Sequence, residues 1–450
     1  MAKSAGAKVP KLKQYIRPPK PAWPEGRTAL AVAYSGGGFR ASLAGVGMTR
    51  ALADLDLLRD VRYTSSVSGG SWANALLALH WDDLKADGFT SEAYDEIVLR
   101  PFVETITTKS LTREMVRNLW RLLGPKTRSD LLADAFDEWF GKGRLMGDLS
   151  GDARFIFNST NLNTGARFAF EQARAGDYDV KYIDGDVVRV ADALAASAAL
   201  PGALSAQRLR DHDDVYPDDN KPYLVDGAVY DNLGLEAFRH FHSRPLIVAL
   251  DAGAPLRKGG MGNRNPIRTI TRSSAVMQSQ IPKLRTRWLV DEFRTWEDWE
   301  AAEPEAYATY TADPLGGDMR VKEYVAALGK GADPNTLERP PMPPRRSKRG
   351  VTFGLGTSLD PKKGDIQSTI SRHQRYAPDD IAHEVPPWRS PMTAEAFRAH
   401  CAAVPMSAGK FDPELCRDLV YRGWFLTRET LRTFHPDVLT VDPPAWREWA

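Results

Sequence analysis

Three consecutive glycines, at 36–38, separate a short apolar run from a segment with helical periodicity. The run before them, 28–34 (TALAVAY), has the length of a strand, and 39–58 carries apolar residues at helical spacing. The same order recurs at once, with a second strand expected over 61–67 and a helix over 69–80. A chain that repeats strand, turn and helix in this way predicts an α/β fold with a parallel sheet covered by helices.

Strand-like segments continue to about residue 251, and residues 28–255 are therefore expected to form one α/β domain. The further strands are expected at 154–158, 187–190, 223–225 and 245–250. Residues 82–150 interrupt this pattern with charged and long apolar side chains at helical spacing. They predict a helical insertion, which is either a lid over a site or a packing extension of the domain.

The two ends of the chain differ from this central domain. Residues 1–27 mix Lys, Pro and Gly, and are expected to form a flexible basic arm. Residues 256–450 are expected to be a helical extension that completes the same fold, with a strand at 351–357 and a closing helix at 418–434. Within this extension, the proline-rich and basic stretch 338–350 predicts a mobile loop.

Composition excludes several other classes of protein. Sixty basic and 58 acidic residues leave a net charge of +2, which gives no reason to propose nucleic acid as a partner. The apolar runs are too short to span a bilayer, and the first residues lack the apolar stretch of a signal peptide, so a cytoplasmic location is expected. Cys401 and Cys416 form no disulfide framework and flank no metal-ligand cluster.

The glycine run can bind an anion, because backbone free of side chains turns sharply and presents several N–H groups at a helix N-terminus. In an acyl hydrolase that anion is the tetrahedral oxyanion. Gly36, Gly38 and Ala41 also satisfy the dinucleotide pattern G-x-G-x-x-A, which needs an acidic residue at the end of the second strand. That strand ends instead in 65–68 (SSVS), and no Gly-Lys-Ser or Gly-Lys-Thr follows the run as a P-loop requires.

The second strand runs into Ser68, in the sequence 66–70 (SVSGG). This approximates the nucleophile elbow G-x-S-x-G between a strand and a helix, with Ser66 in place of the first glycine. The strained turn lifts the serine hydroxyl out of the sheet and requires small neighbours. The alternative is a Ser/Gly turn that only caps the next helix.

A carboxylate base is predicted at Asp226, which follows an apolar strand and precedes a glycine. Its alternative is an ordinary Asp-Gly turn, and Asp231 is the rival carboxylate nearby. A Ser-His-Asp triad would need a histidine after the acid, for which His240 and His242 are the candidates.

Taken together, these segments resemble the patatin-like phospholipases, particularly their bacterial branch, and more distantly the catalytic domain of cytosolic phospholipase A2. Three further segments share the likeness, namely 155–165 (FIFNSTNLNTG), 196–203 (ASAALPGA) and 226–236 (DGAVYDNLGLE). The resemblance covers about residues 28–255, and several motifs in one order are more specific than any single motif. It implies a three-layer fold with a central, mostly parallel sheet.

The resemblance also implies a role for individual residues. Ser68 matches the nucleophile, Asp226 its partner in a dyad without histidine, and the glycines of the oxyanion loop are Gly36, Gly37 and Gly38. Arg40 matches an arginine that lies near the substrate phosphate, although an arginine at the start of a helix can also be solvated.

The expected function is that of a lipid acyl hydrolase of the phospholipase A or lysophospholipase type, which needs no metal or organic cofactor. Galactolipids, neutral glycerides and other acyl esters are also compatible substrates. The basic segments 3–27 and 345–349 and the tryptophans at 288–299 suggest peripheral contact with an anionic membrane, or else solvated loops and packed helices. The alternative from another class is a catalytically silent lipid-binding or scaffold protein, and the oligomeric state stays open.

Overall fold

The computed structural model describes residues 11–239, 244–253, 266–344, 347–358, 384–405 and 409–449. Within them one mixed sheet has the strand order β6-β5-β4-β3-β2-β1-β8-β9, and β7 pairs with β3. The strands are β1 (Leu30–Tyr34), β2 (Val61–Val67), β3 (Arg154–Asn161), β4 (Arg167–Glu171), β5 (Arg174–Asp177), β6 (Lys181–Asp184), β7 (Leu224–Asp226), β8 (Leu246–Asp251) and β9 (Gly350–Gly354).

Five strands, β3, β2, β1, β8 and β9, run parallel to one another, and β4, β5 and β6 extend the sheet as antiparallel neighbours beyond β3. The central strand β1 is buried along its whole length because both faces of the sheet are covered. Its alternate side chains point to opposite faces, with Leu30, Val32 and Tyr34 in the larger core and Ala31 and Ala33 in the smaller one.

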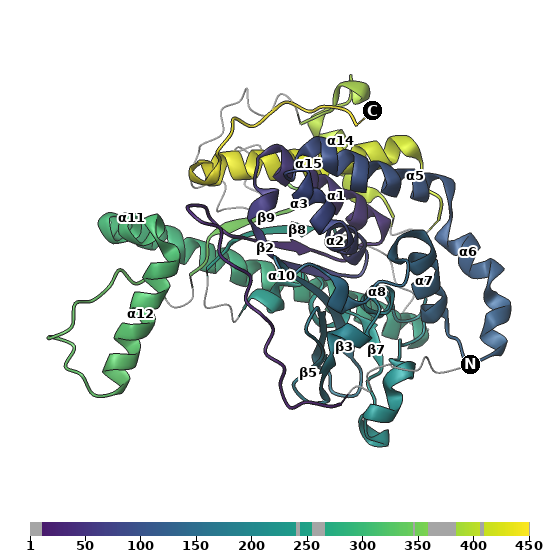
Figure 1. The fold of residues 1–450 in the computed structure, drawn as a ribbon. Helices are drawn as coiled ribbons and strands as arrows, with labels where there is room; N and C mark the ends of the chain where they lie inside the picture. Colours follow the sequence, from purple (N-terminus) through teal and green to yellow (C-terminus); the bar gives the residue numbers. More distant parts are fainter. Residues whose placement is uncertain are drawn as a thin grey trace.

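Helices cover both faces of the sheet and give three layers (Figure 1). The larger core lies under α1, α2, α8 and α15, and the smaller one lies against α10. The helices are α1 (Phe39–Asp54), α2 (Gly70–Leu79), α3 (Trp81–Ala86), α4 (Ser91–Tyr94), α5 (Arg100–Thr108), α6 (Leu111–Arg117), α7 (Arg128–Phe136), α8 (Val190–Ser197), α9 (Ala228–Asp231), α10 (Pro266–Ala302), α11 (Pro304–Ala312), α12 (Pro314–Gly329), α14 (Ala394–Ala403) and α15 (Pro413–Phe434).

The expected three-layer α/β fold is confirmed, with a mixed sheet whose five central strands are parallel, and the element at 61–67 has the predicted bounds. Residues 82–150 contain helices and helical turns joined by loops, with an isolated β-bridge at Leu145 and no strand. The strand expected at 187–190 is wrong, because Val187 ends a 3-10 turn and Val190 begins α8, whose alanines favour a helix. The antiparallel strands β4, β5 and β6 were not predicted from the sequence.

The N-terminal arm and the basic loop differ from the expectation in part. Lys13 makes two backbone hydrogen bonds with Tyr182 of β6, and the guanidinium of Arg27 pairs with Asp60 at 2.7 Å, so residues 11–27 lie against the domain. Residues 1–10 lie outside the described residues. In the stretch 338–350, residues 345 and 346 lie outside them too, whereas Lys348 packs against α10 through its N–H to Glu292 O at 3.2 Å.

The C-terminal helix α15 packs directly on α1, and glycines allow the two backbones to approach. A Cβ on Gly47 of α1 would lie 2.1 Å from the carbonyl oxygen of Val420, and one on Gly423 of α15 would lie 2.1 Å from that of Ala44. This packing explains how a helix so far along the sequence completes the first layer. Cys401 and Cys416 are free and buried nearby.

We predict that Gly423→Ala lowers the free energy of unfolding by about 1–3 kcal/mol, since the added methyl group must separate two helices. Gly329→Ala is the matched control, because Gly329 ends α12 with nothing within 4 Å of an added Cβ. It should leave stability unchanged or raise it by about 0.5–1 kcal/mol. Urea unfolding of both variants measures this difference, and equal effects would contradict the packing described for α1 and α15.

Candidate active site

Ser68 occupies a strained turn between β2 and α2. Its φ of 51° lies in the left-handed region that side chains other than glycine rarely adopt. A Cβ on the next residue, Gly69, would lie 2.1 Å from the carbonyl oxygen of Gly38, and one on Gly70 would lie 2.5 Å from that of Ser35. The turn therefore has the geometry of a nucleophile elbow, with small residues where the backbone of the glycine loop crosses it.

Ser66, the departure from the elbow pattern, is buried and hydrogen-bonded. Its hydroxyl accepts from Asn74 Nδ2 at 2.9 Å and contacts Ser71 Oγ at 3.1 Å. A serine thus replaces the first glycine without an unsatisfied polar group, because α2 supplies partners for its oxygen.

The register of the sheet brings Asp226 to the end of β2. Strand β2 runs parallel to β3 and ends with Val67 opposite Asn158. Strand β7 runs antiparallel to β3 and ends with Asp226 opposite Ser159, the next residue along. Since β4 occupies the other edge of β3, the two strands approach from opposite ends of one edge and stop beside each other.

Ser197, at the end of α8, holds both turns in place. The Ser68 N–H donates to its Oγ at 3.0 Å and to its carbonyl oxygen at 3.1 Å. The same carbonyl accepts from Gly227 N–H at 3.2 Å, and Asp226 N–H donates to Ala199 O at 3.0 Å. The segment 196–203, which the sequence marks only as a family likeness, therefore fixes the turn at Ser68 relative to Asp226. The family likeness singles out this segment, but nothing in its sequence pattern predicts these hydrogen bonds.

The carboxylate of Asp226 is buried, with 1% of the residue exposed. This burial raises its pKa to about 6, against hydrogen bonds from Ala228 N–H and the Ser68 side chain, which favour the charged form and lower the pKa. A carboxylate in hydrogen-bond contact with a serine, and with a pKa close to neutral, can accept the proton of that serine.

The glycine loop lines the same space, but its three amides differ. Gly36 N–H donates to Asn232 O at 3.0 Å, so it is not available to an oxyanion. Gly37 and Gly38 have positive φ values of 154° and 63°, and in the part of the chain that the structure describes no acceptor binds their N–H groups. A Cβ on Gly36 would lie 2.3 Å from Asn232 Oδ1 and 3.1 Å from the Ser68 Cβ. Gly36 therefore contributes close packing rather than a donor.

Arg40 has a different environment from the one expected. It is 1% exposed, and its guanidinium donates to the carbonyl oxygens of Val404 at 2.8 Å, Ala402 at 3.1 Å and Ala252. Its side chain does not line the cavity around Ser68. Arg40 joins the end of β8 to the segment after α14, and this placement does not support a contact with substrate phosphate.

A cavity of about 720 Å³ opens above Ser68 and Asp226. Its walls are mostly apolar, and the large apolar side chains that line it include Phe39, Trp72, Leu111, Met115, Leu132, Leu200 and Leu204. Arg128, which is exposed, is the one cationic side chain among the described lining residues. The space fits an extended apolar chain with a charged group at its mouth.

The rival residues lie elsewhere or outside the described residues. Asp231 is buried and accepts from Leu233 N–H at 3.1 Å and Glu236 N–H at 2.8 Å, so it stabilises the loop after α9. His240 and His242 both fall in 240–243, which lies outside the described residues. Among those that are described, no three His, Cys, Asp or Glu side chains form a group that could hold a metal ion.

The sequence matches a known protein family over part of its length. The model of the patatin-like phospholipase family matches residues 32–239, a region that includes Ser68 and Asp226. Residues 32–239 are therefore similar to a patatin-like phospholipase domain. A comparison with curated proteins gives no match.

The solved structures that the chain is similar to include human GIVD cytosolic phospholipase A2, at 13% identity and a TM-score of 0.46, over 92% of this chain and 63% of that one. The same human protein in complex with methyl gamma-linolenyl fluorophosphonate inhibitor and terbium chloride gives 14% identity and a TM-score of 0.44, over 92% and 60%. VipD from Legionella pneumophila gives 11% identity and a TM-score of 0.29, over 97% and 82%. The chain spans about three fifths of the length of the human structures.

We predict that Asp226→Asn raises the free energy of unfolding at pH 8. The pKa of about 6 in the folded protein exceeds the ordinary value of 3.8, so ionisation of Asp226 destabilises the fold as pH rises from about 4 to about 6. Asparagine keeps the shape without the charge, and should add about 2 kcal/mol at pH 8 and less at pH 4.5. Urea unfolding at both pH values measures this gap in the free energy of unfolding between the variant and the wild type, with exposed Asp87→Asn as control. A gap that does not change with pH would contradict the burial argument.

Proposed function

We propose that the protein is a serine lipid acyl hydrolase that cleaves carboxylic esters of phospholipids through Ser68 and Asp226. The observation that supports this most is the pairing of a serine in a strained elbow with a buried carboxylate of raised pKa, at the base of an apolar cavity. The match to the patatin-like phospholipase family supports the same class of reaction.

The reaction begins when the Ser68 Oγ attacks the ester carbonyl carbon and Asp226 accepts the hydroxyl proton. The negative charge that develops on the carbonyl oxygen is stabilised by the N–H groups of Gly37 and Gly38, with the N-terminus of α1 behind them. Asp226 then gives the proton to the leaving alcohol or lysolipid, and Ser68 is left acylated.

Water completes the cycle by the reverse exchange. Asp226 takes a proton from the water, the resulting nucleophile attacks the acyl carbon, and the proton returns to Ser68 as the acid leaves. With a pKa of about 6, Asp226 is mostly ionised at pH 7 and remains basic enough to accept a proton. No step in this scheme calls for a metal or an organic cofactor.

The lining of the cavity supports a substrate with a long acyl chain. Leucine, methionine and aromatic side chains surround the space, and burying an apolar chain there releases water from both surfaces. Arg128, rather than Arg40, is proposed to recognise the substrate phosphate. Arg128 lines the cavity and is exposed, so a phosphate group that it binds would remain in water.

We predict that Ser68→Ala and Asp226→Asn each lower kcat/KM by at least about a thousandfold, since the nucleophile or its base is lost. Hydrolysis of a phospholipid in neutral detergent micelles and of p-nitrophenyl butyrate in solution measures this. Wild-type kcat/KM for the soluble ester should fall about tenfold per pH unit below about pH 6, as Asp226 takes up a proton. A folded wild type that hydrolyses neither substrate would instead favour a silent lipid-binding protein.

We predict that Arg128→Gln raises KM for an anionic phospholipid in neutral micelles by about fivefold, which corresponds to about 1 kcal/mol for an exposed ion pair. Hydrolysis of p-nitrophenyl butyrate, which carries no phosphate, should be unchanged. Arg320→Gln, at an exposed site on α12, is the control. An equal loss on both substrates would contradict a role for Arg128 in phosphate recognition.

A further inference from the structure

Large apolar side chains are exposed on the segment that forms one wall of the cavity mouth. Val116 on α6 is 59% exposed, and on the following turn η3 (Leu119–Leu123) Leu119 is 43%, Trp120 68% and Leu123 93% exposed. We call these four residues the rim patch. Figure 1 shows α6 at the outer edge of the molecule, away from the helices that cover the sheet. Such a cluster of water-exposed apolar surface indicates an interaction site.

The rim patch is continuous with the interior of the cavity. Val116 and Leu119 line the cavity as well as facing solvent, whereas Trp120 and Leu123 extend the apolar surface outward from them. On α10, residues of which also line the cavity, Val276 and Met277 are 37% and 60% exposed. An apolar path therefore leads from the outer surface to Ser68.

Positive charge surrounds this apolar surface. Residues 109–128 contain six basic side chains and one acidic one, and residues 269–290 contain four basic side chains and no acidic one, although Arg285 pairs with Glu236. Arg117 pairs with Glu114, and both Arg121 and Lys126 pair with Asp134 of α7. In the part of the chain that the structure describes, Lys109, Arg113 and Arg128 have no carboxylate partner, and all three are exposed.

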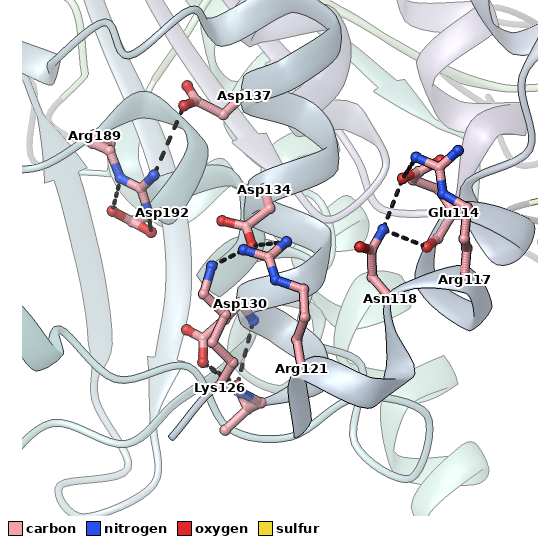
Figure 2. A network of polar contacts seen from close by, with 11 residues as sticks. Glu114, Arg117, Asn118, Arg121, Lys126, Asp130, Asp134, Asp137, Arg189 and Asp192 are labelled. Carbon is pink, nitrogen blue, oxygen red and sulfur yellow. Dashed lines mark hydrogen bonds and ion pairs between the residues drawn. The ribbon is translucent and has the colours of Figure 1, made fainter. Parts of the chain in front are cut away.

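Ion pairs fix the orientation of the rim patch on α7. Figure 2 shows Arg121 and Lys126 converging on Asp134, and Asn118 hydrogen-bonded to Glu114 on the turn before. Thr127 and Asp130 form a capping box at the start of α7. The polar side of the segment is thus used for attachment to the domain, and its apolar side is left to the surroundings.

We infer that the rim patch docks the protein on an anionic lipid bilayer, with the mouth of the cavity against the membrane. Trp120 and Leu123 would enter the interfacial layer, while the surrounding cations attract acidic head groups. A lipid could then move from the bilayer into the cavity without exposing its acyl chain to water. This inference rests on the proposed function for the identity of the substrate.

The rim patch differs from the membrane-contacting segments that the sequence alone suggests, such as the tryptophans at 288–299. Trp296 and Trp299 are 3% and 5% exposed and pack with Tyr310, so they cannot enter a membrane while the fold is intact. No helix among the described residues combines the length and the apolar character needed to cross a bilayer. Contact through a surface patch fits both findings.

The test is vesicle flotation in the Ser68→Ala background, which keeps the lipid intact. We expect binding to vesicles of equal parts phosphatidylcholine and phosphatidylglycerol, and at least tenfold weaker binding to phosphatidylcholine alone or at high salt. Adding Trp120→Ala with Leu123→Ser should weaken binding at least tenfold. The control pair, Met319→Ser with Val325→Ser, removes two side chains on α12 that are each 54% exposed, and should bind as the parent does.

Three outcomes would overturn the inference. The parent protein could fail to bind anionic vesicles, or the rim variant could bind as well as the control. Sedimentation could also show that the parent is a dimer that the rim substitutions dissociate, in which case a second copy covers the patch.

Activity measurements distinguish a failure of the docking inference from a failure of the proposed function. With Ser68 intact, Trp120→Ala with Leu123→Ser should keep the hydrolysis of soluble p-nitrophenyl butyrate and lose at least tenfold in the hydrolysis of vesicle lipid. Vesicle binding without hydrolysis of either substrate by the wild type would overturn the proposed function and leave the docking surface standing.

Discussion

The site depends on one edge of β3, where two strands that run in opposite directions both end. Strand β2 stops opposite Asn158 and β7 stops opposite Ser159, so their last residues become neighbours although they are far apart in the sequence. The end of α8 locks this meeting point, because the carbonyl of Ser197 accepts from the backbone on both sides. A shift of one residue in the register of β7 would turn the Asp226 side chain to the opposite face of the sheet and separate it from Ser68. The contacts that set this register are therefore part of the site.

Burial at this point has opposite effects on chemistry and on stability. It raises the pKa of Asp226 toward neutrality, which makes the carboxylate a better base than an exposed aspartate. It also places the charge of Asp226 where water cannot solvate it. The turn next to it adds a second cost, because it keeps Ser68 at a φ of 51°. Close packing elsewhere offsets these costs, and the contact of α1 with α15 is the clearest case. The helix that begins at the glycine loop is held against the sheet by a helix from the end of the chain.

The sequence predicts the central β-α-β unit well because its signals are local. Glycines at 36–38, the serine turn at 68 and the apolar strand before Asp226 each require a particular backbone shape, and the structure has those shapes. It does not predict the antiparallel strands β4 to β6, of which β4 pairs with β3, β5 with β4 and β6 with β5. Nor does it show that Asn232 uses the amide of Gly36, or that carbonyl groups surround Arg40, since these partners lie about 200 to 360 residues away in the chain. The exposure of Trp120 and the burial of Trp296 likewise follow from tertiary packing, which composition alone does not fix.

The central claim is that Ser68 is a nucleophile activated by Asp226. The most direct measurement is mass spectrometry of the protein after reaction with a fluorophosphonate ester, with the modified peptide sequenced and the rate of modification followed from pH 5 to pH 8. The account predicts one adduct, on Ser68, that forms faster as pH rises through about 6 and is nearly abolished by Asp226→Asn. An adduct on another serine, or modification of Ser68 at the same rate in Asp226→Asn, would contradict it.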